Sequence, residues 1–250
     1  MYRNKKIALV IPAYREEKLI KPTLDHVPEL IDKIIVVDDA SPDNQAEVVA
    51  SVAAHDPRIE LIKHKDNCGP GQAIITGYLR ASQEGYGLVV VVGGDFQMDL
   101  MEVRSFLDPL IDGEADYVKG NRFLYLKKTL SSMPKIRILG NMMITFLTKF
   151  ASGYYKVSDV VDGYTAITKE AIDTIDWTKA WKKYGYPMDF LIRLNAYGLR
   201  IMEVARTPVY IKGARQSQIK GLSYTVKVFP MLLRGYFWRL GFKYFSFSKR

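Results

Sequence analysis

Short apolar runs alternate with longer segments of helical pattern through the first half of the chain, and this alternation limits the fold more than any other feature. The apolar runs are bounded by Gly, Pro, Asn or Asp, so each predicts a strand: residues 7–13, 33–37, 59–63, 87–92 and 115–119. The intervening segments are long enough for crossover helices: residues 16–27, 44–55, 71–85 and 101–111. We therefore expect an α/β, Rossmann-like fold with a mostly parallel central sheet flanked by helices.

The second half of the chain follows a less regular pattern, which begins with a loop after Arg122. The further elements that we expect are a strongly apolar helix at 135–152, a strand at 159–168, a helix at 186–197 and a strand at 200–210. No run of about 20 apolar residues occurs, so the sequence predicts no transmembrane helix. The single cysteine, Cys68, excludes an internal disulfide. We divide the chain into a main domain at residues 1–210 and a C-terminal segment at residues 211–250.

The whole excess of positive charge lies in the last fifth of the chain. Residues 204–250 contain ten Lys or Arg and no Asp or Glu, whereas residues 1–203 contain 26 basic and 27 acidic residues. Aromatic and basic side chains are interleaved between residues 222 and 247, as in segments that lie in a membrane interface. The pattern predicts binding to an anionic membrane surface, and a final helix that packs on the core is the alternative. Nucleic acid is not expected as a partner, because no RNP-like motif accompanies these residues.

Polar loops follow the first and second predicted strands, at the sheet edge where open α/β sheets bind ligands. The first loop could hydrogen-bond a nucleobase edge and contains Pro12, Ala13, Tyr14 and Glu16. The second loop contains Asp38 and Asp39, adjacent carboxylates that repel each other unless they bind donors. One carboxylate can cap the next helix while the other accepts hydrogen bonds from a ribose or a base. An ordinary turn is the alternative for each loop.

Two further loops combine glycines with polar side chains. Gly71 and Gln72 open a predicted helix, and a helix N-terminus attracts phosphate. The loop after the most apolar strand contains Gly94, Asp95, Gln97 and Asp99. Asp95 and Gln97 present oxygen atoms that suit Mg²⁺ or Mn²⁺, whose remaining ligands can be phosphates and waters. A loop that caps the next helix is the alternative.

Asp189 lies at the start of the helix predicted at residues 186–197. An acid at this position can be a general base, or it can be favoured there by the positive end of the helix dipole. Both interpretations stay open at this point. His26, His55 and His64 have no metal-ligand spacing, so we expect structural or surface roles for them.

In this order and spacing, the four loop motifs resemble the family 2 glycosyltransferases of the GT-A fold. The likeness is greatest to polyprenyl-phosphate sugar transferases such as dolichyl-phosphate mannosyltransferase, and it covers about residues 6–220. It implies that residues 1–210 form a GT-A catalytic domain. The implied donor is a nucleoside diphosphate sugar, either a UDP-sugar or a GDP-sugar. The first loop and Asp39 match the nucleoside-binding positions, and Asp95 and Gln97 match the metal-binding end of the family's D-x-D-x-Q pattern.

The resemblance also indicates residues that contact phosphate. Arg122, in Gly-Asn-Arg, matches the arginine of the family's G-S-R motif. The family's S-K-[LM] reads Ser-Gln-Ile at residues 217–219, and Arg215 or Lys220 could replace its lysine. Gly93 stands where the D-x-D-x-Q pattern has its first Asp, which leaves fewer carboxylates for the metal.

The resemblance implies an inverting transfer of a sugar to a polyprenyl phosphate or another lipid-linked acceptor, with Asp95 and Arg122 as catalytic residues. Asp189 is needed as a base only for a hydroxyl acceptor, as in the alternative of cell-surface polysaccharide synthesis. We expect a cytoplasmic enzyme that is peripheral on the inner face of the membrane. Alternatives from other classes are a nucleotidyltransferase, whose G-x-G-T-R-like loop is absent here, and a noncatalytic membrane-binding module.

Overall fold

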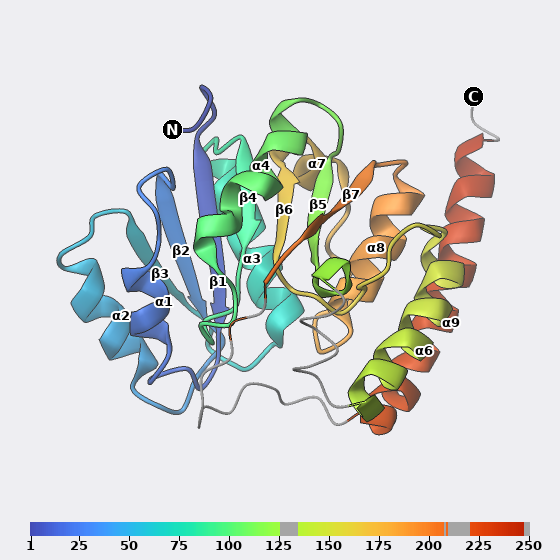
Figure 1. Cartoon of the computed structure of the whole chain (residues 1–250), viewed down its shortest axis with the longest axis horizontal. Helices are drawn as coiled ribbons and strands as arrows, with labels where there is room; N and C mark the ends of the chain where they lie inside the picture. The colour runs from blue at the N-terminus through green and yellow to red at the C-terminus, as the bar shows by residue number, and fades with distance from the viewer. Residues whose placement is uncertain (126–134, 208, 210–220, 248–250) are drawn as a thin grey trace.

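Seven strands pair into one sheet in the computed structural model, which describes residues 1–125, 135–207, 209 and 221–247 (Figure 1). The strands are β1 (Ile7–Ala13), β2 (Lys33–Asp38), β3 (Ile59–Lys63), β4 (Leu88–Val91), β5 (Tyr117–Asn121), β6 (Thr165–Thr168) and β7 (Ile201–Ala205). Their order across the sheet is β3-β2-β1-β4-β6-β5-β7. The first five confirm the strands expected from the apolar runs, with ends that shift by up to two residues.

The sheet is mostly parallel, as the alternation predicted. β1 pairs in parallel with β2 and with β4, β2 with β3, and β5 with β7. Among the strands of the described residues, only β6 runs antiparallel, to β4 on one side and β5 on the other. From β1 the chain moves outward to β2 and β3 and then returns to β4 on the other side of β1. A crevice therefore opens at the carboxyl ends of β1 and β4, where such sheets bind ligands.

Helices cover both faces of the sheet (Figure 1). They are α1 (Ile20–Asp25), α2 (Gln45–Ala53), α3 (Pro70–Gln83), α4 (Val103–Ile111), α6 (Lys135–Ser152), α7 (Lys169–Thr174), α8 (Tyr186–Ala196) and α9 (Gly221–Phe247), with short 3-10 turns η1 (Leu100–Glu102) and η2 (Arg122–Tyr125). One core combines residues of α3, α6, α7, α8 and α9 with one face of the sheet. The other core combines α1, α2 and α4 with the opposite face. Burial on both faces explains why the strands are continuously apolar.

The long C-terminal helix α9 packs against α6 and α8 at one edge of the molecule (Figure 1). Its Val228, Met231 and Leu232 are buried in the core. At Gly235 the helix approaches α8 so closely that a Cβ would lie 2.6 Å from Ile192 Cδ1. The first part of the predicted C-terminal segment, residues 211–220, lies outside the described residues, and the described remainder joins the main core. Within the described part of the chain, no helix is long and apolar enough to cross a bilayer.

Candidate functional site

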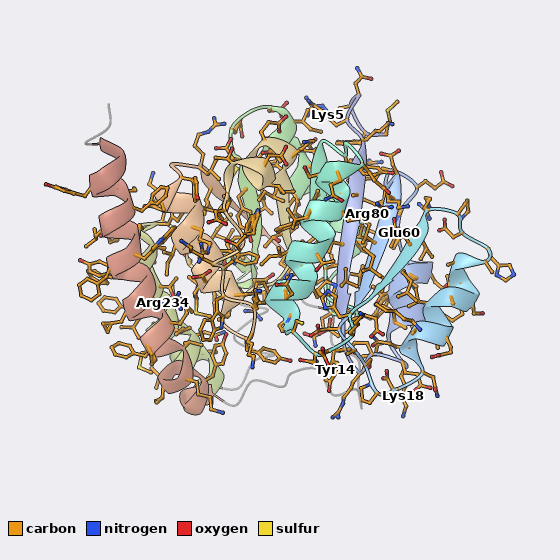
Figure 2. The ribbon with its side chains drawn as sticks, turned by 180° about the vertical axis from the view of Figure 1, so that it is seen from behind. Lys5, Tyr14, Lys18, Glu60, Arg80 and Arg234 are labelled. Carbon is orange, nitrogen blue, oxygen red and sulfur yellow. The ribbon has the colours of Figure 1, made fainter. Side chains whose placement is uncertain are left out.

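Two adjoining cavities lie at the carboxyl edge of the sheet. The first, of about 290 Å³, is lined by Pro12, Ala13, Tyr14, Glu16, Asp39, Asn67, Gly69, Pro70, Ala73, Lys183 and Tyr184. The second, of about 200 Å³, shares Pro12, Glu16, Pro70 and Tyr184 with the first and adds Asp95 with its glycine neighbours Gly93 and Gly94. Figure 2 shows Tyr14 at the end of β1, near the start of α3. The loops after β1, β2 and β4 therefore each contribute predicted residues to one cleft.

Asp39 lies in the first cavity and is held by three donors. The backbone N–H groups of Cys68 and Gly69 donate to its carboxylate, at 2.9 and 2.7 Å. His64 Nδ1 lies 2.8 Å from Asp39 Oδ1, and His64 Nε2 lies 3.0 Å from the Thr76 hydroxyl. The sequence pattern predicts only a structural or surface role for His64. Its place at the end of β3, beside the Asp39 loop, is the signal that could have identified it.

The same Asp39, His64 and Cys68 side chains place a carboxylate oxygen, a ring nitrogen and a sulfur within 4.8 Å of one another. Both ring nitrogens of His64 already have hydrogen-bond partners, and both Asp39 oxygens accept from donors. We interpret the group as a hydrogen-bond network and not as a metal site.

Asp38 is buried behind the cavity, and its carboxylate shapes the loop. It accepts hydrogen bonds from the Ser41 backbone at 3.1 Å and from the Gln45 side-chain amide. Gln45 also donates to the Ala13 carbonyl at 3.1 Å and accepts from the Glu16 N–H at 3.0 Å. Gln45 thus ties the loop after β1 to the loop after β2, a role that the sequence reasoning missed. Asp38 does not line either cavity, and its assignment to the nucleotide sugar remains a prediction.

Glu16 and Asp95 form an acidic pair in the second cavity. Burial, together with the charges of Asp95 and Asp43, raises the pKa of Glu16 to about 8. Burial also raises the pKa of Asp95, although the Gln97 N–H donates to that carboxylate at 3.3 Å. Two carboxylates that are costly to ionise together are the donors that a hard divalent cation stabilises. The pair therefore fits Mg²⁺ or Mn²⁺. The sequence predicts that Glu16 binds the nucleotide, and the structure places it beside Asp95.

Asp99 and the backbone of Gln97 have structural contacts in the predicted metal loop, and a metal contact of the Gln97 side chain remains a prediction. The Asp99 carboxylate accepts from the Met101 N–H at 2.9 Å and caps η1. The Gln97 carbonyl accepts from Arg206 Nη1 and from the Val209 N–H, each at 3.0 Å. Arg206 also pairs with the buried Asp162 at 2.7 Å, so it anchors the Asp95 loop to β7. No feature of the sequence indicated this anchoring role.

The glycines at the start of α3 serve close packing. A Cβ on Gly71 would lie 2.6 Å from the Trp181 carbonyl oxygen, and the Gln72 N–H donates to the Lys182 carbonyl at 3.1 Å. Gly69 has φ of +95°, which L residues rarely adopt. The first turn of α3 is thus covered by the segment around Lys182, and neither Gly71 nor Gln72 lines the cavities. Their assignment to phosphate remains a prediction.

Arg122 lies in a buried ion cluster and not among the residues that line the two cavities. Its guanidinium donates twice to Asp159, at 2.7 and 2.8 Å, and lies 3.1 Å from Asp162. The positive charges of Arg122 and Lys119 lower the pKa of Asp159 to about 2 despite its burial. This geometry gives Arg122 a clear structural role, and its contact with substrate phosphate remains a prediction.

Asp189 lies outside both cavities, beside α9. Its carboxylate accepts from the Trp181 N–H at 2.8 Å and from Arg193 Nε at 2.7 Å. It lines a separate pocket of about 50 Å³ with Arg193, Arg234 and Trp238. The Trp181 N–H and the Arg193 guanidinium already occupy this carboxylate, so the geometry favours the helix-start interpretation. Arg215 and Lys220, the other predicted phosphate contacts, lie outside the described residues.

Comparisons with known proteins identify relatives of this chain. The sequence profile of the family described as Glycosyl transferase family 2 matches residues 8–176. The chain is 30% identical over 245 residues to the UDP-N-acetylglucosamine–dolichyl-phosphate N-acetylglucosaminyltransferase of Methanococcus voltae, an alignment that covers 92% of this chain and 96% of that protein. It is 27% identical to the undecaprenyl-phosphate mannosyltransferase of Micrococcus luteus, over 81% of this chain and 83% of that protein.

A solved structure of glucosyl-3-phosphoglycerate synthase from Mycobacterium tuberculosis, in complex with Mn²⁺, UDP and phosphoglyceric acid, has the same fold. The TM-score is 0.68 at 18% sequence identity, and the match covers 93% of this chain and 79% of that one. The architecture is the GT-A fold that the loop motifs implied.

Proposed function

The chain belongs to glycosyl transferase family 2, and on this premise we propose that it transfers a sugar from a nucleoside diphosphate sugar to a polyprenyl phosphate or another lipid-linked acceptor. The observation that carries the proposal is the continuous cleft, with Asp39 in one cavity and the Glu16–Asp95 pair in the next. A nucleoside fits the first cavity, and its diphosphate then reaches the acidic pair.

The nucleoside is held by the first cavity. The Asp39 carboxylate, fixed by His64 and two backbone N–H groups, orients towards base or ribose donors. Tyr14 and Pro12 supply apolar walls for the flat base. Lys183, which lines the same cavity, supplies a cation. The names of the two relatives from Methanococcus voltae and Micrococcus luteus both contain a polyprenyl phosphate, which supports this acceptor class, and the first also contains a UDP-sugar donor.

The acidic pair would hold the divalent cation. Gly93 replaces the first Asp of the D-x-D-x-Q pattern, which removes one carboxylate. Glu16 supplies a second carboxylate beside that of Asp95. When bound, Mg²⁺ or Mn²⁺ supplies Lewis-acid stabilisation of the charge that grows on the leaving diphosphate. Arg206 keeps the Asp95 loop in place through the Gln97 carbonyl, so the carboxylate does not need to reorganise during transfer. The Mn²⁺-bound GT-A neighbour supports this assignment.

A polyprenyl phosphate suits a site without a base. The acceptor oxygen attacks the anomeric carbon from the face opposite to the leaving diphosphate, which inverts the configuration. A phosphate is already ionised near neutral pH and needs no proton acceptor. Asp189 is bound to Arg193 and lies outside the cleft, so the geometry favours this acceptor over a sugar hydroxyl. The basic C-terminal residues favour an enzyme that works at the inner, cytoplasmic face of the membrane.

A panel of donors tests the proposal directly. The protein is incubated with UDP- and GDP-sugars, Mn²⁺ and a short-chain isoprenyl phosphate that is soluble in water. We expect one donor to release its nucleoside diphosphate only when the acceptor is present, with the sugar recovered on the acceptor phosphate. Transfer to a sugar hydroxyl with no transfer to the phosphate would overturn the acceptor assignment. A folded protein that consumes no donor would overturn the activity.

A further inference from the structure

Helices α6 and α9 carry apolar side chains on their outer sides, away from the core. On α6, Leu139, Phe146 and Phe150 are spaced by seven and four residues and are exposed. On α9, Phe229, Leu233 and Phe237 are spaced by four residues and are also exposed. These spacings place each set on one side of its helix. Phe146, Phe150 and Phe237 keep 61%, 51% and 64% of their surface exposed, which is unusual for phenylalanine in a folded chain.

The two apolar stripes are held in a fixed relation. Arg239 of α9 donates from Nε to the Ala151 carbonyl at 2.9 Å and from Nη2 to the Phe150 carbonyl at 3.2 Å. It therefore ties α9 to the last turn of α6. The two helices lie side by side along one edge of the molecule (Figure 1), and Figure 2 shows Arg234 on the outer helix of this edge. The stripes therefore lie on two adjacent helices, and we call their combined exposed surface the α6–α9 face.

The charge of these helices selects the kind of partner. Neither α6 nor α9 contains an Asp or a Glu. Lys227 and Arg234 are exposed on α9, and Lys149 is partly exposed on α6 between two of the exposed phenylalanines. A second copy of the same face would bring these cations together, and like charges oppose such pairing. An anionic bilayer offers both complements, since acyl chains receive the rings and headgroups receive the cations.

We propose that the α6–α9 face inserts its apolar stripes into the membrane interface and holds the cleft at the surface that carries the lipid acceptor. Insertion would involve α6 as much as the basic C-terminal segment, so binding is not only electrostatic. Trp238, which the sequence pattern would place among the inserting rings, instead lies under the Arg193 guanidinium at 4.9 Å. This inference rests on the proposed function for its acceptor, whereas the binding itself can be measured without any turnover.

Vesicle binding of an α6 variant is the decisive experiment. Phe146→Gln with Phe150→Gln leaves every residue of the C-terminal segment unchanged and removes two exposed rings. We expect its partition onto phosphatidylcholine vesicles with a minority of phosphatidylglycerol to fall by at least about tenfold, with an unchanged melting temperature. Wild-type binding should persist in part at high salt, because apolar insertion is not screened. The matched control is Leu79→Gln with Met101→Gln, two exposed apolar residues elsewhere, which should bind like the wild type.

Three results would overturn the inference. The first is an α6 variant that binds vesicles as well as the wild type, and the second is a wild-type protein that never binds them. The third is a wild-type dimer in sedimentation that the α6 variant loses, which would make the face a contact between copies. Turnover of the short-chain acceptor in solution should be equal in the wild type and the α6 variant. If neither protein turns over this acceptor, the proposed function is contradicted, but the conclusion from vesicle binding is unaffected.

Discussion

His64 Nδ1 lies 2.8 Å from the carboxylate of Asp39, and the other ring nitrogen of His64 lies 3.0 Å from the hydroxyl of Thr76. The imidazole therefore links α3 to the loop after β2, and it fixes one oxygen of Asp39 before any nucleotide arrives. Preorganised acceptors of this kind bind a donor without losing side-chain freedom. The link makes His64 a positioning residue of the nucleoside cavity.

Replacement of His64 tests this positioning role. We expect His64→Ala to weaken nucleoside diphosphate binding by about three- to tenfold, the effect of roughly one hydrogen bond. His64→Gln, whose amide can donate to Asp39, should recover part of the affinity. Titration calorimetry measures both, and His55→Ala is the control because His55 is exposed at the end of α2. Equal affinity of His64→Ala and the wild type would show that Asp39 needs no such support.

Asp39→Ala should have a larger effect than His64→Ala. The carboxylate itself would make the contact with the nucleoside, so we expect a loss of roughly 1.5–3 kcal/mol, as for a hydrogen bond to a charged group. The same titration measures the loss, and circular dichroism checks that the variant is folded. An unchanged affinity in a folded variant would place the nucleoside elsewhere in the cleft.

Asp95 should be required for catalysis through the divalent cation. We expect Asp95→Ala to lower kcat/KM by at least about 100-fold, the scale of a lost electrostatic contact in the transition state. Asp99→Asn is the matched control, since Asp99 caps η1 and should have a small effect. The donor assay measures both variants. Full activity of the wild type in excess EDTA would contradict the metal role.

The raised pKa of Glu16 predicts a pH-dependent metal affinity. With a pKa of about 8, Glu16 is mostly protonated near neutral pH, and a cation must displace this proton. The apparent affinity for Mn²⁺ with nucleoside diphosphate should therefore rise with pH up to about 8, by up to roughly tenfold per unit, and then level off. Calorimetry at several pH values checks the slope. Glu16→Gln should bind Mn²⁺ more weakly, and its affinity should no longer rise with pH. If the affinity of the variant still rises with pH, the displaced proton belongs to another group.

The same pKa shift has a consequence for the metal-free protein. The pKa of Glu16 is higher in the folded chain than its ordinary value of 4.5, so the folded state binds more protons than the unfolded state between the two values. The free energy of unfolding contributed by Glu16 should therefore fall as the pH rises from about 4.5 to 8. Urea unfolding across this pH range should show a smaller fall in the free energy of unfolding for Glu16→Gln than for the wild type.

The sequence predicted those features that depend on local pattern. Buried parallel strands are continuously apolar, so β1 and β3 were predicted with their observed bounds. Parallel strands also bring their carboxyl ends to one edge, which is why Asp39 and Asp95 could be assigned to one cleft. Gln45 and Arg206 were missed because their partners lie in distant segments of the chain, and no spacing encodes such contacts.

Gly71 shows a second limit of sequence reasoning. A glycine in the first turn of a helix is equally suited to a phosphate and to a close protein contact, because both need the space of a missing side chain. The structure places the Trp181 carbonyl in that space. The pairing of Asp189 with Arg193 is similar, since a helix-start acid looks the same in sequence whether it acts as a base or binds an arginine four residues later.

Arg234 and Arg239 provide the sharpest contrast within α9, because sequence alone treats both as membrane-facing cations. Arg234 is exposed, whereas Arg239 is buried and donates to the Ala151 and Phe150 carbonyls and to the Asn195 side chain.

We expect Arg239→Gln to lower the free energy of unfolding by about 3 kcal/mol, because buried carbonyls lose charged donors. Arg234→Gln should change stability by less than about 0.5 kcal/mol. It should nevertheless weaken binding to anionic vesicles by roughly fivefold, the loss of one cation near the surface. Urea unfolding and vesicle sedimentation measure the two effects separately. The opposite result, with Arg239→Gln stable but released from vesicles, would show that Arg239 reaches the headgroups and that the contact between α6 and α9 opens at the membrane.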